Sequence, residues 1–356
     1  MDKFELVDTS SASTIGRKWL RVEKRSFERL AANGRFVERL YDLEMTYAAL
    51  VEAFVTIEKV KTTKSLERMY YPGAFFHSEV AERYQHRQLT RNFSSAVIGL
   101  LSIGRLYVDQ VDSFLKEYSQ KKFAKKIKTE LTGYKPITNA KKNARKTKPI
   151  VFENCFFHEL RNAMQHSTQG MVGYGSSVPY SSRRSESDWL DELPDSFWQT
   201  YPQLNLNKIK SISSSAKKKF ELIQKTFPDK WTTFTGFGEG AGDLGELLPK
   251  YLENLSKTHT KIRKKVSWRK KKAEKVFESA RGTYLKLNLN GNEKSIFLFR
   301  NRDESDFCLD VSTSALGNIS ELEHEFAGSE QIRDRILLGD QSPSARAIHS
   351  PSPAIV

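Results

Sequence analysis

Residues 35–57 read RFVERLYDLEMTYAALVEAFVTI, and this segment sets the architecture that the 356-residue sequence predicts. Its large apolar side chains recur at alternating spacings of four and three: Phe36, Leu40, Leu43, Tyr47, Leu50, Phe54 and Ile57. At 3.6 residues per turn, these positions form one stripe along a helix. The segment therefore predicts a long helix whose apolar stripe packs against a partner.

Three further helices are expected downstream. Residues 93–118 repeat the same apolar spacing, which predicts a second long helix that packs antiparallel to the first. A third helix is expected from about Val151 to Ser167. Asp243 and Glu246 form a capping pair that opens a fourth helix, which ends near Ala280. The predicted fold class is mainly α, an antiparallel helical bundle.

A small C-terminal β module is expected after the bundle. Leu285, Leu287 and Leu289 alternate with polar residues, Asn290-Gly291 offers a tight turn, and an apolar run returns at 296–299. This pattern predicts a β-hairpin. Residues 307–311 alternate in the same way and predict a third strand.

The predicted domain organisation follows from these elements and from changes in composition. Residues 121–149 combine many lysines with Gly133 and Pro136 and few apolar groups, so we expect an exposed basic connector with little packed structure. The predicted parts are an N-terminal arm (1–34), a helical domain (35–280) with this connector and a loop-rich insertion (170–241), a β-hairpin/α module (281–338) and a disordered tail (339–356).

The positive charge of the chain is local. The net charge is +15, but residues 121–148 hold eleven Lys and Arg against one Glu, and residues 257–275 hold ten against one Glu. The remaining residues are mildly acidic. Charge gathered in this way indicates a polyanionic partner such as nucleic acid.

The second basic segment includes an aromatic residue. Trp268 lies among six basic residues: Lys264, Lys265, Arg269, Lys270, Lys271 and Lys272. An aromatic ring among cations suits stacking on bases, so we predict that these seven residues bind nucleic acid. The alternative is a solvated helix face.

Neither a metal site nor a membrane anchor is predicted. The cysteines, Cys155 and Cys308, are far apart and lack metal-ligand spacing. The N-terminus shows no secretory signal, and Arg105 interrupts the longest apolar stretch, 96–108. We expect a cytoplasmic protein without a metal or cofactor. Glu321, Glu323, His324 and Glu325 look like one short charged helix.

The expected third helix has two different faces. Its apolar side chains fall on one side: Phe152, Phe156, Phe157, Leu160, Ala163 and Met164. The other side gathers cationic, amide and imidazole groups: His158, Arg161, Asn162, Gln165 and His166. Such groups can bind phosphate and move protons near neutral pH. The alternative is a hydrogen-bonded solvated face or a dimer contact.

The hexapeptide from Arg161 to His166, RNAMQH, resembles the Arg-x4-6-His signature of HEPN domains, in which a polar residue, here Asn162, often follows the arginine. The resemblance extends over residues 35–280, because a helical bundle with the motif on a late helix is similar too. It implies a metal-independent endoribonuclease, of a defence or toxin system, that acts as a homodimer with paired motifs.

By this resemblance, His166 is the general acid or base, Arg161 stabilises the phosphate, and Asn162 orients or polarises the site. The expected partners are RNA, a second copy of the chain and a regulatory protein that the sequence does not identify. Two alternatives remain at this point: a noncatalytic nucleic-acid-binding module and an interaction scaffold.

Overall fold

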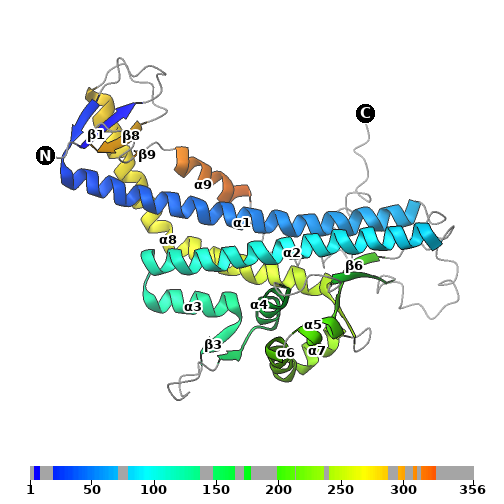
Figure 1. Ribbon diagram of the computed structural model, residues 1–356. Coiled ribbons are helices and arrows are strands. Elements are labelled where there is room, and N and C mark those ends of the chain that lie inside the picture. The colour runs from blue at the N-terminus through cyan, green and yellow to red at the C-terminus, as the bar shows by residue number, and fades with distance from the viewer. Residues whose placement is uncertain are drawn as a thin grey trace, which may run out of the picture. The chain divides into compact units, whose positions relative to one another are not determined.

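The computed structural model is mainly helical (Figure 1). It describes residues 4–8, 19–70, 79–136, 147–164, 172–177, 199–212, 214–235, 240–287, 296–300, 308–310 and 314–325. Three long helices dominate the described residues: α1 (Lys24–Tyr70), α2 (Glu79–Tyr118) and α8 (Leu244–Leu287). Among the described helices, none combines the length and apolar content needed to cross a lipid bilayer.

The stripes read from the sequence are buried. All seven apolar positions of the first stripe, from Phe36 to Ile57, are at most 2% exposed. On α2, Phe93, Val97 and Leu100 are fully buried. Asp243 precedes α8 and accepts a hydrogen bond from Gly245 N at 2.6 Å, which confirms it as the N-cap. The long helices therefore form for the reasons that the sequence indicates.

The chain divides into two compact units to which each long helix contributes. Unit 1 comprises Met1–Ala48, Gln110–Ala124 and His259–Ala327. Unit 2 comprises Ala49–Asp109, Lys125–Thr258 and Gly328–Val356.

Unit 1 contains helix α9 (Ser314–Glu325) and a four-stranded antiparallel sheet of order β2-β1-β8-β9. Its strands are β1 (Phe4–Asp8), β2 (Trp19–Val22), β8 (Ile296–Arg300) and β9 (Cys308–Asp310). Residues 1–34, predicted as an arm, thus supply two strands and the first turns of α1. The predicted strand at β9 and the short charged helix α9 are confirmed.

The prediction that Leu285 and Leu287 belong to the first strand of a hairpin is wrong. Helix α8 continues through Leu287, so Leu285 and Leu287 are helical. Strand β8 pairs instead with β1, in the register Phe4↔Arg300. The predicted turn at Asn290-Gly291 and the tail at 339–356 lie outside the described residues.

Unit 2 is organised around helix α4 (Phe152–Met164). A three-stranded antiparallel sheet has the order β5-β6-β7 and consists of β5 (Val172–Ser177), β6 (Gln199–Asn205) and β7 (Ala241–Asp243). The unit also contains α5 (Leu206–Ile212), α6 (Ser214–Thr226) and α7 (Pro228–Thr235). The expectation that 170–241 is mainly loop is therefore wrong for its described residues.

The packing against α4 explains this difference. The ring of Phe156 makes edge contacts with Phe220 of α6 and with Trp231 and Phe234 of α7, at centroid distances of 5.6, 6.2 and 4.9 Å. These large side chains are widely spaced in a polar sequence, but together they bury one aromatic cluster.

The basic connector is also more structured than expected. Helix α3 (Lys121–Thr132) buries Ala124, Ile127 and Leu131 on one face, and its lysines occupy the other. Strands β3 (Tyr134–Pro136) and β4 (Thr147–Pro149) then pair antiparallel. The expectation of little packed structure is wrong because one narrow apolar stripe is enough to hold this helix.

Candidate functional site

Helix α4 has the two faces that the sequence predicts. The six apolar side chains assigned to its inner face are all buried. Arg161 and Asn162, on the other face, are half-buried. Gln165 and His166 lie outside the described residues. The structure thus places two of the three predicted catalytic side chains, on the last turns of α4.

Arg161 lies beside a second arginine. Burial lowers the pKa of Arg161 and the positive charge of Arg105, on α2, lowers it further, whereas the charge of Asp109 raises it. Arg105 donates to Asp109 from Nε to Oδ2 at 2.7 Å. Within the described part of the chain, no carboxylate forms an ion pair with Arg161. The guanidinium group of Arg161 is therefore available for an anion.

Glu159 connects three side chains next to Arg161. Lys219, on α6, donates to Oε2 of Glu159 at 2.7 Å. The amide of Asn162 approaches the same oxygen at 3.5 Å, which is a long and weak hydrogen bond. Burial and the charge of Glu159 raise the pKa of Tyr134, which also hydrogen-bonds to Glu159. Asn162 is therefore held by its own helix.

His158 belongs to the same face, three residues before Arg161. Burial lowers its pKa; the charge of Glu159 raises it, whereas Arg105, Lys219 and Arg161 lower it further. The ring makes an edge contact with Tyr134 at 5.9 Å between centroids. Its surroundings therefore favour the neutral form of the imidazole.

Sequence reasoning missed this cluster around Arg161. It placed His158 on the polar face of the helix but gave it no role in the site, and it treated Arg105 only as an interruption of an apolar stretch. The spacing of three between His158 and Arg161 was a usable signal, because such residues are neighbours on a helix. The sequence carries no signal that Arg105 and Lys219 approach this face, because they come from other helices.

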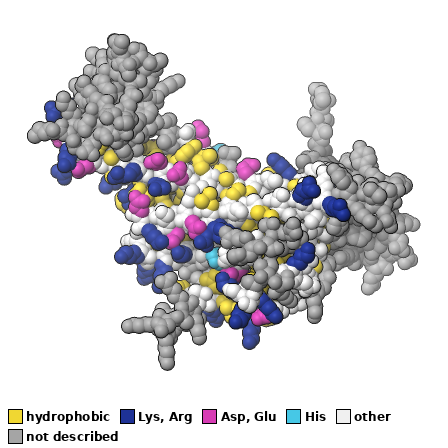
Figure 2. All heavy atoms as spheres, in the orientation of Figure 1, with side chains coloured by type: hydrophobic (Ala, Val, Ile, Leu, Met, Phe, Trp, Pro, Cys, Tyr) yellow, Lys and Arg dark blue, Asp and Glu magenta, His cyan; other side chains and the backbone are white. Residues whose placement is uncertain are grey.

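The seven predicted nucleic-acid-binding residues of α8 divide into three groups. Arg269 lies over the rings of Phe36 and Tyr118, at 5.2 and 4.8 Å, and Lys270 pairs with Glu323 at 2.7 Å. All of these contacts lie within unit 1. Lys265 lies 5.6 Å from the ring of Phe123. The exposed members are Lys264, Trp268, Lys271 and Lys272. Figure 2 shows Lys and Arg side chains spread over one face of the molecule, with Asp and Glu among them.

Other candidate chemistry is sparse in the described residues. They contain no group of three or more His, Cys, Asp or Glu side chains placed to hold a metal ion. Cys155 is buried, and its burial raises the pKa of the thiol to about 12. A thiol with so high a pKa is a poor nucleophile.

Comparison of the chain with protein-family models, with curated proteins and with solved structures finds no match.

Proposed function

We propose that this protein is an HEPN-like, metal-independent endoribonuclease that acts as a homodimer. Its phosphodiester site is the polar face of α4, with Arg161 as the phosphate-binding cation, Asn162 as an orienting group and His166 as the general acid or base. A role in a defence or toxin system fits this activity. The observation that carries the proposal is the half-buried Arg161, unpaired among the described residues and next to Arg105.

The two arginines favour phosphate over other ligands. The positive charge of Arg105 disfavours the charged form of Arg161, and a bound anion would offset this repulsion. Asp109 forms an ion pair with Arg105, and its charge also acts on Arg161, so one carboxylate serves two cations. A phosphodiester accepts paired N–H donors from guanidinium and carries the charge that both cations need.

The reaction requires proton transfers that imidazoles perform near neutral pH. In the proposed step, His166 takes the proton of the ribose 2′-hydroxyl. The 2′ oxygen then bonds to phosphorus as the bond from phosphorus to the 5′ oxygen breaks. The protonated imidazole of His166 of the partner subunit gives its proton to the leaving 5′ oxygen. The products are a 2′,3′-cyclic phosphate and a free 5′-hydroxyl.

The test is cleavage of a labelled RNA pool in excess chelator, with end-group analysis. The wild type should produce 2′,3′-cyclic phosphate ends. His166→Ala should lower the rate by roughly 10²- to 10⁴-fold, and Arg161→Ala by roughly 10²- to 10³-fold. Lys217→Ala, an exposed change on α6, is the matched control and should cleave like wild type. Equal cleavage by wild type and His166→Ala would refute the proposal.

The variant His158→Gln separates the two imidazoles of α4. If His158 only supports the site, cleavage by His158→Gln falls much less than cleavage by His166→Ala. If His158→Gln loses cleavage and His166→Ala retains it, the assignment of the acid or base to His166 is wrong.

A noncatalytic nucleic-acid-binding protein is the second candidate function. The exposed lysines and Trp268 on α8 favour it, because they require no chemistry at α4. It predicts salt-dependent binding that His166→Ala leaves unchanged, with no RNA cleavage by any variant.

A further inference from the structure

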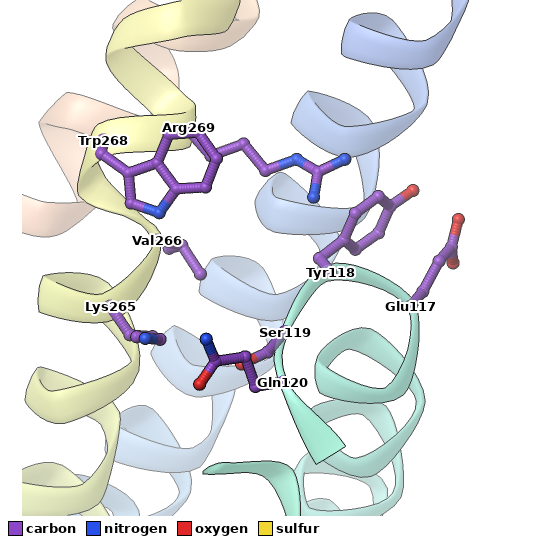
Figure 3. A pocket seen from close by; sticks show the side chains of 8 residues that line it. All are labelled: Glu117, Tyr118, Ser119, Gln120, Lys265, Val266, Trp268 and Arg269. Atoms are coloured by element: carbon purple, nitrogen blue, oxygen red, sulfur yellow. The ribbon is translucent and has the colours of Figure 1, made fainter. Parts of the chain in front are cut away.

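The first turn of α3, where the first basic segment begins, contacts the second basic segment in unit 1. The end of α2 and the two residues that follow it face α8 across a hollow of about 330 Å³ (Figure 3). Glu117 to Gln120 line one side, and Lys265, Val266, Trp268 and Arg269 line the other. Lys265 also lies 5.6 Å from the ring of Phe123, in the first turn of α3. Segments that are more than 100 residues apart in the chain thus form one surface.

The lining of this hollow offers an aromatic face and uncharged polar groups. Trp268 is 60% exposed, and the nitrogen edge of its indole is turned toward Val266 and the hollow (Figure 3). Ser119 and Gln120, between α2 and α3, line the opposite side of the hollow. An amide and a hydroxyl can hydrogen-bond to the edge of a base, and an exposed indole can stack on its face.

Exposed lysines follow or precede the lining residues on α8 and on α3. On α8, Lys264, Lys271, Lys272 and Lys275 are exposed, and none of them pairs with a carboxylate of the described residues. At 100° per residue they share one side of the helix with Trp268, over about 16 Å. Lys121 and Lys122 are exposed on the first turn of α3. Glu117 is the one acidic group of the lining, and it hydrogen-bonds to Tyr118.

We propose that this hollow and the lysines beside it form a binding site for single-stranded RNA, separate from the face of α4. One base stacks on Trp268 with its edge toward Gln120 and Ser119. The phosphates on either side lie along the lysines of α8 and the start of α3. Single strands fit because only an unpaired base exposes its face to a side chain.

The affinity of this surface is measured without relying on cleavage. A labelled 2′-O-methyl oligonucleotide has no 2′-hydroxyl to react, so its fluorescence anisotropy with the full chain reports binding alone. Trp268→Ala should weaken binding roughly 5- to 150-fold, the range for loss of one stacked base, whereas Trp268→Phe keeps most of the affinity. The side chain of Trp268 is largely exposed, so its removal leaves the core intact.

The lysines are tested by the salt dependence of binding. The double change Lys271→Ala and Lys272→Ala should reduce the slope of log affinity against log salt by about 1.4, at ~0.7 for each lost phosphate contact. The matched control is Lys217→Ala with Lys218→Ala, two exposed lysines on α6, which should leave the slope unchanged.

Three results would overturn this proposal. They are unchanged binding by Trp268→Ala, an equal loss for the α8 and α6 lysine pairs, and binding of duplex RNA as tight as that of the single strand. Because the probe is inert, a failure here leaves the ribonuclease proposal standing. A failure of cleavage likewise leaves this site standing.

Discussion

Glu44 is buried in the core of unit 1 with two basic partners from α8. Arg263 donates to it from Nη2 at 2.6 Å and from Nε at 3.1 Å, and His259 Nε2 donates at 3.1 Å. Tyr47 stacks on the ring of His259 at 3.8 Å. Burial depresses the pKa of His259, so Arg263 is the permanent positive partner at neutral pH. The network joins α1 to α8 through a charge that neither helix could bury alone.

We expect Glu44→Gln to lower the free energy of unfolding by roughly 3 kcal/mol, because it leaves Arg263 half-buried without its carboxylate. Denaturant unfolding followed by circular dichroism measures the change. Glu38→Gln, an exposed change on the same helix, is the control and should alter stability by less than about 0.5 kcal/mol. Equal effects of the two changes would show that the buried network contributes nothing.

The same carboxylate makes stability depend on acid pH. Burial raises the pKa of Glu44, but His259 and Arg263 outweigh burial and lower it from 4.5 to about 2. A depressed pKa stabilises the folded state fully above the unfolded value and less as pH falls toward the folded one. The stability difference between wild type and Glu44→Gln should therefore be constant above pH 5 and shrink between about pH 4.5 and pH 2. A difference that grows on acidification would contradict this.

At the level of single residues, the sequence predicted the members of the α4 face but not their neighbours. The positions of Arg161 and Asn162 follow from the period of one helix, which the sequence carries. Arg105 and Lys219 approach that face only because α2 and α6 pack beside α4. The same limit applies to Arg269, which was predicted to bind nucleic acid, because its contact with Phe36 joins residues far apart in the chain.

Among the elements, the helices could be predicted and the sheet pairing could not. A stripe such as Phe36 to Ile57 is local, so one segment of sequence contains it. Strands β1 and β8 pair although more than 280 residues of chain separate them. An alternating apolar pattern predicts that a segment is a strand, but it does not predict which other strand pairs with it. Helix α3 was missed because its lysines outnumber the three side chains that it buries.

The junction of α3 and β3 depends on one glycine. Gly133 has φ of 70°, a left-handed conformation that ends α3, and its carbonyl accepts from Ile150 N at 2.8 Å. A Cβ there would lie 2.5 Å from Cys155 N. We expect Gly133→Ala to cost at least ~1–2 kcal/mol of stability, since both the left-handed strain and the backbone of α4 oppose it.

Gly99 provides the matched control for this change. It lies within α2, and a Cβ added there would meet no atom within 4 Å. Gly99→Ala should therefore raise the stability by about 0.5–1 kcal/mol through a better helix propensity. Thermal unfolding of the two variants should shift in opposite directions. A loss of the same size in both would mean that conformation at Gly133 is not what matters.

For the whole molecule, the two RNA-directed proposals belong to different units. The face of α4 lies in unit 2, and the hollow beside Trp268 lies in unit 1. Each unit has its own core, so changes at the exposed Trp268 should leave the fold around Arg161 unaffected. A chain that holds RNA on one unit and cuts it on the other gains local substrate concentration at the cutting site.

The proposed chemistry also requires two copies of the chain. Arg161 and His166 are five residues apart, about 140° around a helix axis, so one helix does not readily direct both side chains to one phosphate. Two motifs that face each other across a dimer supply both. We therefore expect the cleavage rate per protomer to fall on dilution, in step with the loss of dimer measured by analytical ultracentrifugation.

Mixing wild type with His166→Ala tests this arrangement directly. A mixed dimer of the two holds only one His166, so the 2′-hydroxyl and the leaving 5′ oxygen cannot both have an imidazole. An excess of His166→Ala should therefore suppress cleavage by a fixed amount of wild type. If the rate per protomer is constant on dilution and the mixture cleaves as fast as the wild type that it contains, each chain works by itself. Arg161 would then have to reach the phosphate that His166 of the same helix contacts. Arg105 of the same chain would be the better candidate for a second cation at that phosphate.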